Sequence, residues 1–271
     1  MSDEVYVQYL GGPNIELIEN YFMDLSTGEI QKNGTVVECG AAEGHFNPSL
    51  TLEGIYGWKY YAFEPDDNMY PILCYKRPNA EKLKCALSNF IGKAKFYESA
   101  HNGNSSLKHS DVHKNELNTY KERFQDGSIT KEIEVDVVNW QWFIDKYSIK
   151  TVNLLTLDVE GHELTVLDGI KSTSVYPEVI QVEFLRCDFS NSLLDEAKKQ
   201  NYSGFVAISK MLYGMGYEFN YVSDSNAHFS LKSFWANKPK PENWSAEEDK
   251  FEWLGYSFYD KALCKELIKD L

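Results

Sequence analysis

The sequence predicts an α/β fold, with a mostly parallel β-sheet covered by helices on both faces and an antiparallel pair of strands at one edge. Two observations support this fold class. Between residues 35 and 184, short β-branched or apolar runs alternate with helical segments, as in parallel strands joined by helical crossovers. Farther along, a long helical segment is followed by two strand-like runs around the turn Asp224-Ser225-Asn226, which predicts a hairpin.

The alternation divides the chain into segments with recognisable beginnings and ends. An amphipathic helix is expected at 15–22, before a turn-rich stretch that contains Gly28 and Gly34. Apolar or β-branched runs predict strands at 35–39, 59–63, 81–87, 94–97, 132–137, 152–157, 179–184, 218–222 and 229–236. Helices are expected at 46–53 with a start near Pro48, and at 67–75, 140–147, 163–169 and 191–215, the last interrupted at 202–204.

These elements predict one principal domain at 35–237, preceded by a helical extension at 1–34 and followed by a helical tail at 238–271. The length of 271 residues suits one large α/β domain with extensions. Within this domain, residues 99–128 are polar and charged and have no sustained apolar period. Loops of this length are usually functional lids or disordered segments, so the excursion is expected to be one of the two.

The chain is strongly acidic, with 27 lysine and arginine residues against 41 aspartate and glutamate residues and a formal net charge of −14. Such a charge repels phosphate backbones and anionic lipids, so neither nucleic acid nor a membrane is expected as a partner. The alternative is a local basic groove built from Lys82, Lys84, Lys93, Lys95 and Lys108, which are better explained as solvated surface lysines.

Composition also limits the compartment and the use of cysteine. No apolar run approaches the roughly 20 residues that span a bilayer, and the acidic start of the sequence lacks the features of a signal peptide. A cytoplasmic location is therefore expected. The five cysteines lie far apart and form no Cys-x-x-Cys pair, which predicts reduced thiols rather than disulfides or a zinc site.

A ligand-binding motif is predicted at the end of the first strand, at residues 36–44 (VVECGAAEG). Gly40 and Gly44 have no side chain, so the backbone at these positions can approach a ligand closely at the start of a helix. Glu64 ends the second strand, where a carboxylate can accept both hydroxyl hydrogens of an adenosine ribose. The alternative is that the glycines only make a tight turn and that Glu64 is a surface charge.

Two details favour S-adenosylmethionine over a nicotinamide dinucleotide as the ligand of this motif. A dinucleotide site normally shows Gly-x-Gly-x-x-Gly, and here the position two residues after Gly40 is Ala42. Glu38 would repel a pyrophosphate, whereas it suits the ammonium group of a methionine moiety. An NAD-dependent oxidoreductase is the alternative enzyme class.

A second motif, at residues 154–163 (LLTLDVEGHE), ends a buried strand in several acids and one histidine. Asp158 and Glu160 are candidates to position an acceptor hydroxyl or take its proton, and His162 is a candidate base near neutral pH. The alternative is that Glu160 and Glu163 cap the following helix and that His162 points to solvent.

Glu183 ends the next predicted strand and would lie beside Asp158 if the two strands are neighbours. Two such carboxylates could bind one divalent cation and lower the pKa of an acceptor hydroxyl. They could equally accept hydrogen bonds from a substrate without metal. We favour the second interpretation because the spacing suggests no third hard ligand.

The motifs and their order resemble those of the FkbM-type methyltransferases, a branch of the class I S-adenosylmethionine-dependent fold. The matching pieces are residues 36–44, Ala-Phe-Glu-Pro (62–65), Ala-Leu-Ser-Asn (86–89), Asn-Ser-Ser-Leu (104–107), Leu-Asp-Val-Glu-Gly-His-Glu (157–163) and Gln-Val-Glu (181–183). They cover roughly residues 35–185, and the Asp-Val-Glu-Gly-x-Glu element is the most specific. In one departure, family sequences often have a lysine where this chain has Thr156, so such a lysine is not available here to activate the acceptor.

The resemblance implies a seven-stranded Rossmann-like sheet, adenine near residues 86–88 and a loop at 104–106 that closes over the donor. The residues expected to contact the donor are Glu38, Gly40, Ala41, Gly44, Glu64, Pro65, Ala86, Leu87, Ser88, Ser105 and Asp158. The candidate catalytic residues are Asp158, Glu160, His162 and Glu183.

The expected activity is an S-adenosylmethionine-dependent O-methyltransferase acting on a hydroxyl of a sugar, glycan or related metabolite. Because a sugar hydroxyl is a weak acid, a base or a metal must assist, and no divalent cation is predicted. The non-enzymatic alternative is a protein that keeps the fold and binds the donor without turnover. The sequence does not specify the acceptor or the oligomeric state.

Overall fold

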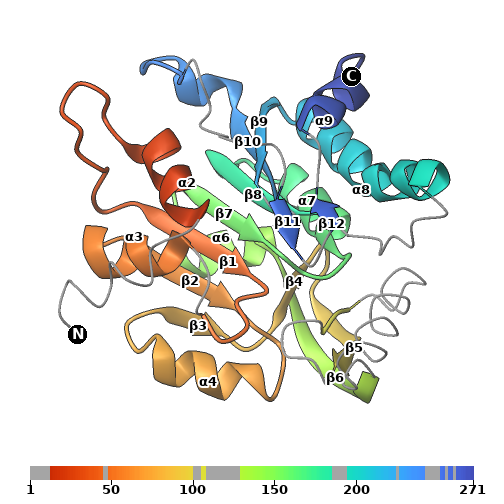
Figure 1. Ribbon diagram of the computed structural model, residues 1–271. Coiled ribbons are helices and arrows are strands. Elements are labelled where there is room, and N and C mark those ends of the chain that lie inside the picture. Colours follow the sequence, from red (N-terminus) through yellow and green to blue (C-terminus); the bar gives the residue numbers. More distant parts are fainter. Residues whose placement is uncertain are drawn as a thin grey trace.

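The centre of the molecule is a seven-stranded β-sheet, drawn as the arrows that cross the middle of Figure 1. The structure is a computed structural model that describes residues 13–44, 48–99, 105–107, 129–184, 194–223, 226–241, 251–253, 256–258 and 261–271. The strands of this sheet are β1 (Thr35–Cys39), β2 (Lys59–Phe63), β3 (Glu81–Leu83), β7 (Leu154–Leu157), β8 (Val179–Glu183), β9 (Tyr217–Ser223) and β10 (Asn226–Leu231).

The strand order is β3-β2-β1-β7-β8-β10-β9, in which β3 to β8 are parallel and β10 runs antiparallel to its neighbours β8 and β9. This confirms the predicted α/β fold class, with a mostly parallel Rossmann-like sheet and an antiparallel pair at one edge. The chain moves outward from β1 to β3 and then returns to β7 on the other side of β1. Ligands bind at the carboxyl ends of strands at such a switch point, and the motifs that end β1 and β7 both lie there.

Helices cover both faces of the sheet (Figure 1). They are α2 (Pro13–Phe22), α3 (Pro48–Tyr56), α4 (Met69–Lys76), α6 (Trp140–Tyr147), α7 (Glu163–Lys171), α8 (Leu194–Gly214) and α9 (Lys261–Ile268). On one face, α2, α3 and α4 bury Leu17, Leu52 and Leu73 in a common apolar cluster. On the other face, α6 to α9 form a larger cluster that includes Phe143 and Val166.

A second, three-stranded sheet in the order β4-β6-β5 contains β4 (Ala86–Ser88), β5 (Gly92–Ser99) and β6 (Ile129–Asn139). The prediction of a single strand at 81–87 is therefore wrong. The chain leaves the edge of the main sheet at Lys84, which is exposed, and all three residues of β4 are buried against β6 and α7. Gly169 on α7 permits this packing, because a Cβ there would lie 2.7 Å from the carbonyl oxygen of Ser88.

Two other boundaries differ from the prediction. The expected interruption of α8 at 202–204 is absent, because burial of Phe205, Ile208 and Leu212 outweighs the cost of about 1 kcal/mol for one glycine in a helix. The strand expected at 229–236 ends at Leu231, and the chain turns into a 3₁₀ helix, η1 (Lys232–Trp235). Trp235 Nε1 donates to Ser230 Oγ at 2.8 Å and stabilises this turn.

Both terminal regions contain structural features beyond the helical segments that the sequence predicts. Before the domain, α2 packs into the apolar cluster of the main sheet, and Tyr21 Oη donates to Asn220 Oδ1 on β9 at 2.8 Å. The tail contains two short antiparallel strands, β11 (Phe251–Trp253) and β12 (Tyr256–Phe258), before α9, so it is not purely helical. Most of the excursion at 99–128 lies outside the described residues, which include only Ser99 and residues 105–107 of it.

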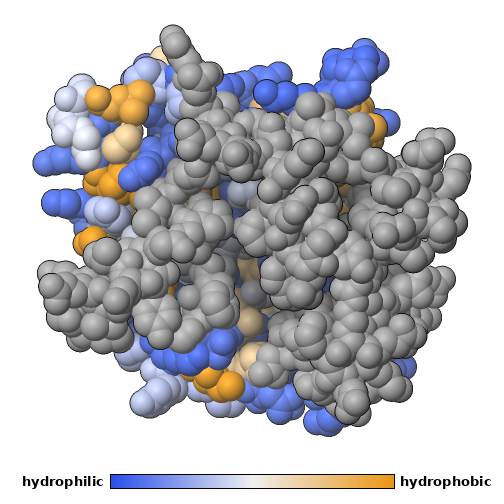
Figure 2. All heavy atoms as spheres, in the orientation of Figure 1, coloured by the Kyte–Doolittle hydropathy of each residue, from blue (hydrophilic) through white to orange (hydrophobic). Residues whose placement is uncertain are grey.

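Hydrophilic residues predominate among the described residues on the face shown in Figure 2, and hydrophobic ones form small separate areas. The lysines considered as a basic groove are paired: Lys84 with Asp67 (2.9 Å), Lys93 with Glu134 (3.2 Å), Lys95 with Glu132 (2.6 Å), and Lys82 with the carbonyl oxygens of Arg77 and Pro78. Lys108 lies outside the described residues. In the described parts of the chain, no helix has the length and apolar character needed to cross a bilayer.

Candidate active site

A cavity opens at the carboxyl ends of β1, β2 and β7, where the two sequence motifs meet. The predicted donor-contacting residues that line it are Gly40, Ala41, Glu64, Pro65, Ala86, Leu87, Ser105 and Asp158. His162, a candidate catalytic residue, also lines it. Glu38, Gly44 and Ser88 are not part of the lining, and each contributes from behind it. We call this space the donor cavity.

The loop after β1 packs directly against the loop after β7. Gly40 has φ +79°, and a Cβ at this position would overlap the carbonyl oxygen of Asp158. The backbone N–H of Asp158 donates to the carbonyl of Cys39 at 3.0 Å, and the N–H groups of Gly40 and Ala41 donate to Phe63 at 3.1 Å. A residue with a side chain at position 40 would separate the two loops, so glycine is required there.

Glu64 lies on the wall of the donor cavity and is only 5% exposed. Its Oε2 accepts from the backbone N–H of Ala42 at 2.6 Å, and its Oε1 accepts from that of Asp66 at 2.8 Å. Burial raises the pKa of Glu64 to about 7. Each carboxylate oxygen has a further lone pair, so Glu64 can still accept hydrogen bonds from a diol. The alternative of a surface charge is therefore wrong.

Glu38 lies behind the donor cavity in a buried hydrogen-bond network. Its Oε2 accepts from Ser49 Oγ and from Tyr60 Oη, both at 2.6 Å, and the side chain is 1% exposed. Burial raises the pKa of this carboxyl. The guanidinium of Arg77 stacks 4.0 Å from the centre of the Tyr60 ring. Contact of Glu38 with the donor stays a prediction, and in the structure this side chain links β1 to α3 and β2.

Arg77 also braces the end of the glycine loop. Its Nη1 donates to the carbonyl of Gly44 at 3.0 Å, and its Nη2 pairs with Glu53 Oε2 at 2.6 Å. Gly44 has φ +74°, and a Cβ there would lie 2.9 Å from both Arg77 Cγ and Leu73 Cδ1. No local pattern in the sequence relates Arg77 to the loop, so it is not among the predicted site residues.

The segment Ser105-Ser106-Leu107 lies along the donor cavity and joins three other parts of the chain. Ser105 Oγ donates to Asp66 Oδ2 at 2.7 Å and accepts from the backbone N–H of Ser99 at 3.0 Å. Ser106 Oγ donates to the carbonyl of Glu160 at 2.9 Å. The segment therefore lies where the resemblance placed a covering loop. Asp66, which the sequence analysis missed, could have been found as an acid just before a helix.

His162 contacts the adenine side of the predicted site. Its Nε2 lies 3.0 Å from Ser88 Oγ, and Ser88 is fully buried at the end of β4. His162 itself is half-buried and precedes α7. It therefore does not point freely into solvent, and its partner is a hydroxyl of the protein on the donor side.

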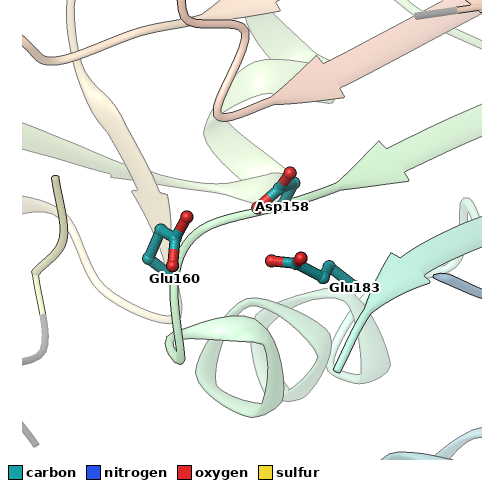
Figure 3. A group of neighbouring side chains, drawn as sticks. All are labelled: Asp158, Glu160 and Glu183. Atoms are coloured by element: carbon teal, nitrogen blue, oxygen red, sulfur yellow. The ribbon is translucent and has the colours of Figure 1, made fainter. Parts of the chain in front are cut away.

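Three carboxylates gather beside the donor cavity, as Figure 3 shows: Asp158 and Glu160 come from the loop after β7, and Glu183 comes from the end of β8. One carboxylate oxygen of each residue lies within 4.8 Å of one oxygen of each of the other two. We call these residues the acid cluster. The predicted proximity of Asp158 and Glu183 is confirmed, because β7 and β8 are neighbours. Glu160 adds a third carboxylate to this pair, whereas the spacing along the sequence suggested no third hard ligand. The sequence-based argument against a divalent cation at this site is therefore wrong.

The loop that carries the acid cluster is fixed by Glu163, the first residue of α7. Its Oε1 accepts from the backbone N–H groups of Gly161 at 3.0 Å and Val159 at 3.2 Å. Glu163 is 4% exposed, and burial raises its pKa to about 7. Glu160 adopts φ +53°, a conformation that costs a residue with a side chain about 1–2 kcal/mol. Such strain is typical of functional loops.

A protein-family model described as the methyltransferase FkbM domain matches residues 38–219. The match includes residues 38–44 of the first motif, the whole of the second motif, the donor cavity and the acid cluster. A search of curated proteins found no match.

Solved structures of methyltransferases show distant similarity. FkbM from Methylobacillus flagellatus KT has 14% identity and a TM-score of 0.41, over 76% of this chain and 46% of that one. Fibrillarin from Aeropyrum pernix, in complex with natively bound S-adenosyl-L-methionine, has 12% identity and a TM-score of 0.39, over 74% of this chain and 66% of that one. A SAM-dependent methyltransferase from Aquifex aeolicus has 13% identity and a TM-score of 0.39, over 84% of this chain and 96% of that one. The chain thus spans slightly less than half of the FkbM structure.

Proposed function

The chain belongs to the FkbM family of methyltransferases, and from this membership we propose that it transfers the methyl group of S-adenosylmethionine to a hydroxyl of a sugar, glycan or related metabolite. The observation that carries the proposal is the position of Asp158. This residue lines the donor cavity and also belongs to the acid cluster. It is therefore able to contact a donor on one side and an acceptor on the other.

The donor cavity offers groups that suit S-adenosylmethionine. The backbone at Gly40 and Ala41 can approach a ligand closely, because no side chain fills the space beside Asp158. Glu64 would accept the ribose hydroxyls, and Ala86 and Leu87 would pack against adenine. S-adenosylmethionine supplies a methyl group on a positively charged sulfur, and the carboxylates around the cavity favour such a charge.

We assign the proton acceptor to Asp158. A hydroxyl that attacks a methyl carbon must lose its proton, and the carboxylate of Asp158 is the group of the acid cluster that also lines the donor cavity. Glu160 and Glu183 would accept further hydrogen bonds from the acceptor and fix its direction of approach. His162 is a weaker candidate, because its Nε2 already pairs with Ser88 Oγ.

The acidic character of the chain supports an uncharged acceptor. With a net charge of −14 and three carboxylates at the site, an anionic substrate would be repelled at long and at short range. Nucleic acid is disfavoured for the same reason. A hydroxylated metabolite or glycan carries many hydrogen-bond donors, which carboxylates accept.

The test combines donor binding with turnover. Titration calorimetry of the purified protein should give binding of S-adenosylmethionine and S-adenosylhomocysteine, and no binding of NAD. Asp158→Asn should retain S-adenosylhomocysteine binding and lose transfer of a radiolabelled methyl group to hydroxylated acceptors. Binding of NAD without binding of either sulfur ligand would refute the proposal. Donor binding with no turnover, and no effect of Asp158→Asn, would favour the non-enzymatic alternative.

A further inference from the structure

Ser106 binds the loop that carries the acid cluster. Its Oγ donates to the carbonyl oxygen of Glu160 at 2.9 Å and lies 3.3 Å from the carbonyl oxygen of Val159, so one hydroxyl proton is shared between two acceptors. Ser106 is 1% exposed and lines the donor cavity, whereas Glu160 belongs to the acid cluster. The hydroxyl therefore connects the donor side of the site to a carboxylate on the acceptor side.

The two carbonyls belong to the two peptide groups that flank the Cα atom of Glu160. The peptide group between Val159 and Glu160 sets φ of Glu160, and the one between Glu160 and Gly161 sets its ψ. These two angles together set the direction in which the side chain leaves the backbone. A donor that contacts both carbonyls therefore fixes the direction of the Glu160 side chain.

Glu160 needs such support because its backbone is strained. Its φ of +53° is left-handed, and Gly161 follows with a φ of +96°. A residue with a side chain keeps a left-handed conformation only where the surrounding structure holds it. Glu163 Oε1 accepts from the N–H of Gly161 at 3.0 Å, while Ser106 donates to the carbonyl at the other end of the same peptide group. This peptide group is thus held at both ends.

Ser106 is itself fixed from outside this loop. It forms an antiparallel bridge with Tyr97 on β5. The N–H of Tyr97 donates to the carbonyl of Ser106 at 2.9 Å, and the N–H of Ser106 donates to the carbonyl of Tyr97 at 3.2 Å. Because β5 belongs to the three-stranded sheet and β7 to the main sheet, Ser106 ties the position of Glu160 to the second sheet.

The neighbouring residue, Ser105, makes the connection to the donor side. Its Oγ donates to Asp66 Oδ2 at 2.7 Å, and the N–H of Asp66 donates to Glu64 Oε1 at 2.8 Å. Glu64 is the carboxylate expected to accept the ribose hydroxyls. The two adjacent serines therefore have separable roles, because Ser105 supports the donor side and Ser106 supports the acid cluster.

We propose that Ser106 is a positioning residue of the methyl transfer, which holds Glu160 in its left-handed conformation and thereby directs the Glu160 carboxylate toward the acceptor. This inference rests on the proposed function, in which Glu160 accepts a hydrogen bond from the acceptor. Without the Ser106 hydroxyl, two carbonyls lose a buried donor and the strained backbone relaxes. The Glu160 carboxylate then moves away from those of Asp158 and Glu183, which it faces in Figure 3.

The kinetic experiment measures transfer of a radiolabelled methyl group from S-adenosylmethionine to the methyl glycosides of glucose, mannose and fucose. Ser106→Ala should lower kcat about tenfold or more, because a displacement of about 1 Å between reacting groups is costly. Its Kd for S-adenosylhomocysteine, measured by calorimetry, should stay within about twofold of the wild-type value. Ser106→Cys keeps a weak donor of similar size, so its kcat should lie between those of Ser106→Ala and the wild type.

Two further serine variants serve as comparisons. Ser105→Ala should weaken binding of S-adenosylhomocysteine about fivefold, as expected for one lost hydrogen bond on the donor side. Ser172→Ala is the matched control. Ser172 is exposed at the end of α7, and its Oγ donates to the carbonyl of Asp168 at 3.2 Å. The control removes a serine-to-carbonyl bond of the same kind outside the site, so kcat and S-adenosylhomocysteine binding should equal those of the wild type.

A double-mutant cycle tests whether Ser106 acts through Glu160. Glu160→Gln removes the carboxylate and should lower kcat by itself. If the serine works by directing that carboxylate, adding Ser106→Ala to Glu160→Gln should lower kcat by less than about twofold further. Two independent roles would instead multiply the two losses, and that result would overturn the proposal.

A crystal structure of Ser106→Ala with bound S-adenosylhomocysteine gives a readout that does not depend on turnover. Glu160 should leave the left-handed conformation, and its carboxylate should shift by about 1 Å or more. If φ of Glu160 and the position of its carboxylate are those of the wild type, the proposal is wrong, even where activity falls.

The outcomes separate this inference from the proposed function. Failure of the wild type to methylate any of the glycosides would count against the proposed function, and the crystal structure would still decide whether Ser106 directs Glu160. Methylation by the wild type with equal kcat for Ser106→Ala and Ser172→Ala would overturn the inference alone. A loss of S-adenosylhomocysteine binding in Ser106→Ala as large as its loss of kcat would assign the serine to the donor side and would also overturn it.

Discussion

Gly40 lies against the backbone carbonyl of Asp158 so closely that a Cβ on Gly40 would overlap the carbonyl oxygen. Gly40 belongs to the donor motif, and Asp158 belongs to the acid cluster. In the proposed reaction, this contact sets the distance between the methyl donor and the carboxylate that would accept the proton. A displacement of about 1 Å between reacting groups is sufficient to slow a reaction strongly.

We expect Gly40→Ala to abolish donor binding, because the new Cβ must push the loop after β1 away from the loop after β7. Calorimetry with S-adenosylhomocysteine measures the loss. Gly28→Ala is the control: Gly28 also has a left-handed φ of +71°, but nothing lies within 4 Å of a Cβ there. The control should lose about 1 kcal/mol of stability from backbone strain alone and bind the donor normally. Equal donor binding by both variants would contradict the role given to this contact.

We expect Arg77→Met to weaken donor binding and to destabilise the protein by about 3 kcal/mol, because it leaves the partly buried carboxylate of Glu53 without its partner and Gly44 without its brace. Urea unfolding and donor titration measure the two effects. In the double variant Arg77→Met/Glu53→Gln, stability should largely return and donor affinity should not. Recovery of both would mean that Arg77 acts only through the ion pair.

We expect Glu163→Gln to remove part of the pH dependence of stability. Burial raises the pKa of Glu163 to about 7, so between about pH 4.5 and 7 the folded protein binds a proton that the unfolded chain has released. The wild type should therefore lose stability as the pH rises through this window. Relative to the wild type, the variant should gain about 2–3 kcal/mol between pH 5 and pH 8.5.

Urea unfolding at several pH values measures this difference, and Glu29→Gln, at an exposed carboxylate, is the control. Parallel pH profiles for the wild type and Glu163→Gln would show that Glu163 does not carry the effect. Because the glutamine keeps an oxygen for the N–H groups of Val159 and Gly161, the loop itself should stay in place.

We expect His162→Phe to raise the KM for S-adenosylmethionine and to preserve the shape of the pH profile of kcat. His162 lines the donor cavity and pairs with Ser88, while Asp158 is the proposed proton acceptor. Steady-state kinetics between pH 5 and pH 9 would check this. Disappearance of a limb of the profile near neutral pH would instead assign the base to His162.

We expect activity to persist after chelation, because the proposed role of the acid cluster is to accept hydrogen bonds and a proton. The measurement compares methyl transfer before and after dialysis against EDTA, with the metal content determined in both samples. Loss of activity that Mg²⁺ or Mn²⁺ restores would assign a cation to Asp158, Glu160 and Glu183, each of which has one carboxylate oxygen within 4.8 Å of one oxygen of each of the other two.

The strands and helices that carry their own periodicity could be predicted closely. The strands β1 and β2 and the helix α6 have the bounds expected from the sequence. The prediction failed where long-range packing decides the outcome. The segment 81–87 divides between two sheets, and α8 continues through Gly204 because its apolar face is buried. Neither choice is visible in the local pattern of residues.

The sequence by itself determined the fold class, the family and the candidate residues of the donor cavity, because glycines and acids at strand ends have local and recognisable spacing. Only the tertiary structure decided how these residues meet. It brings Glu160 into one cluster with Asp158 and Glu183, turns His162 toward Ser88, and aligns Thr156, Gln181 and His228 on one face of the sheet. Strand order and register produce these relations, and both depend on contacts between segments that lie far apart in the chain.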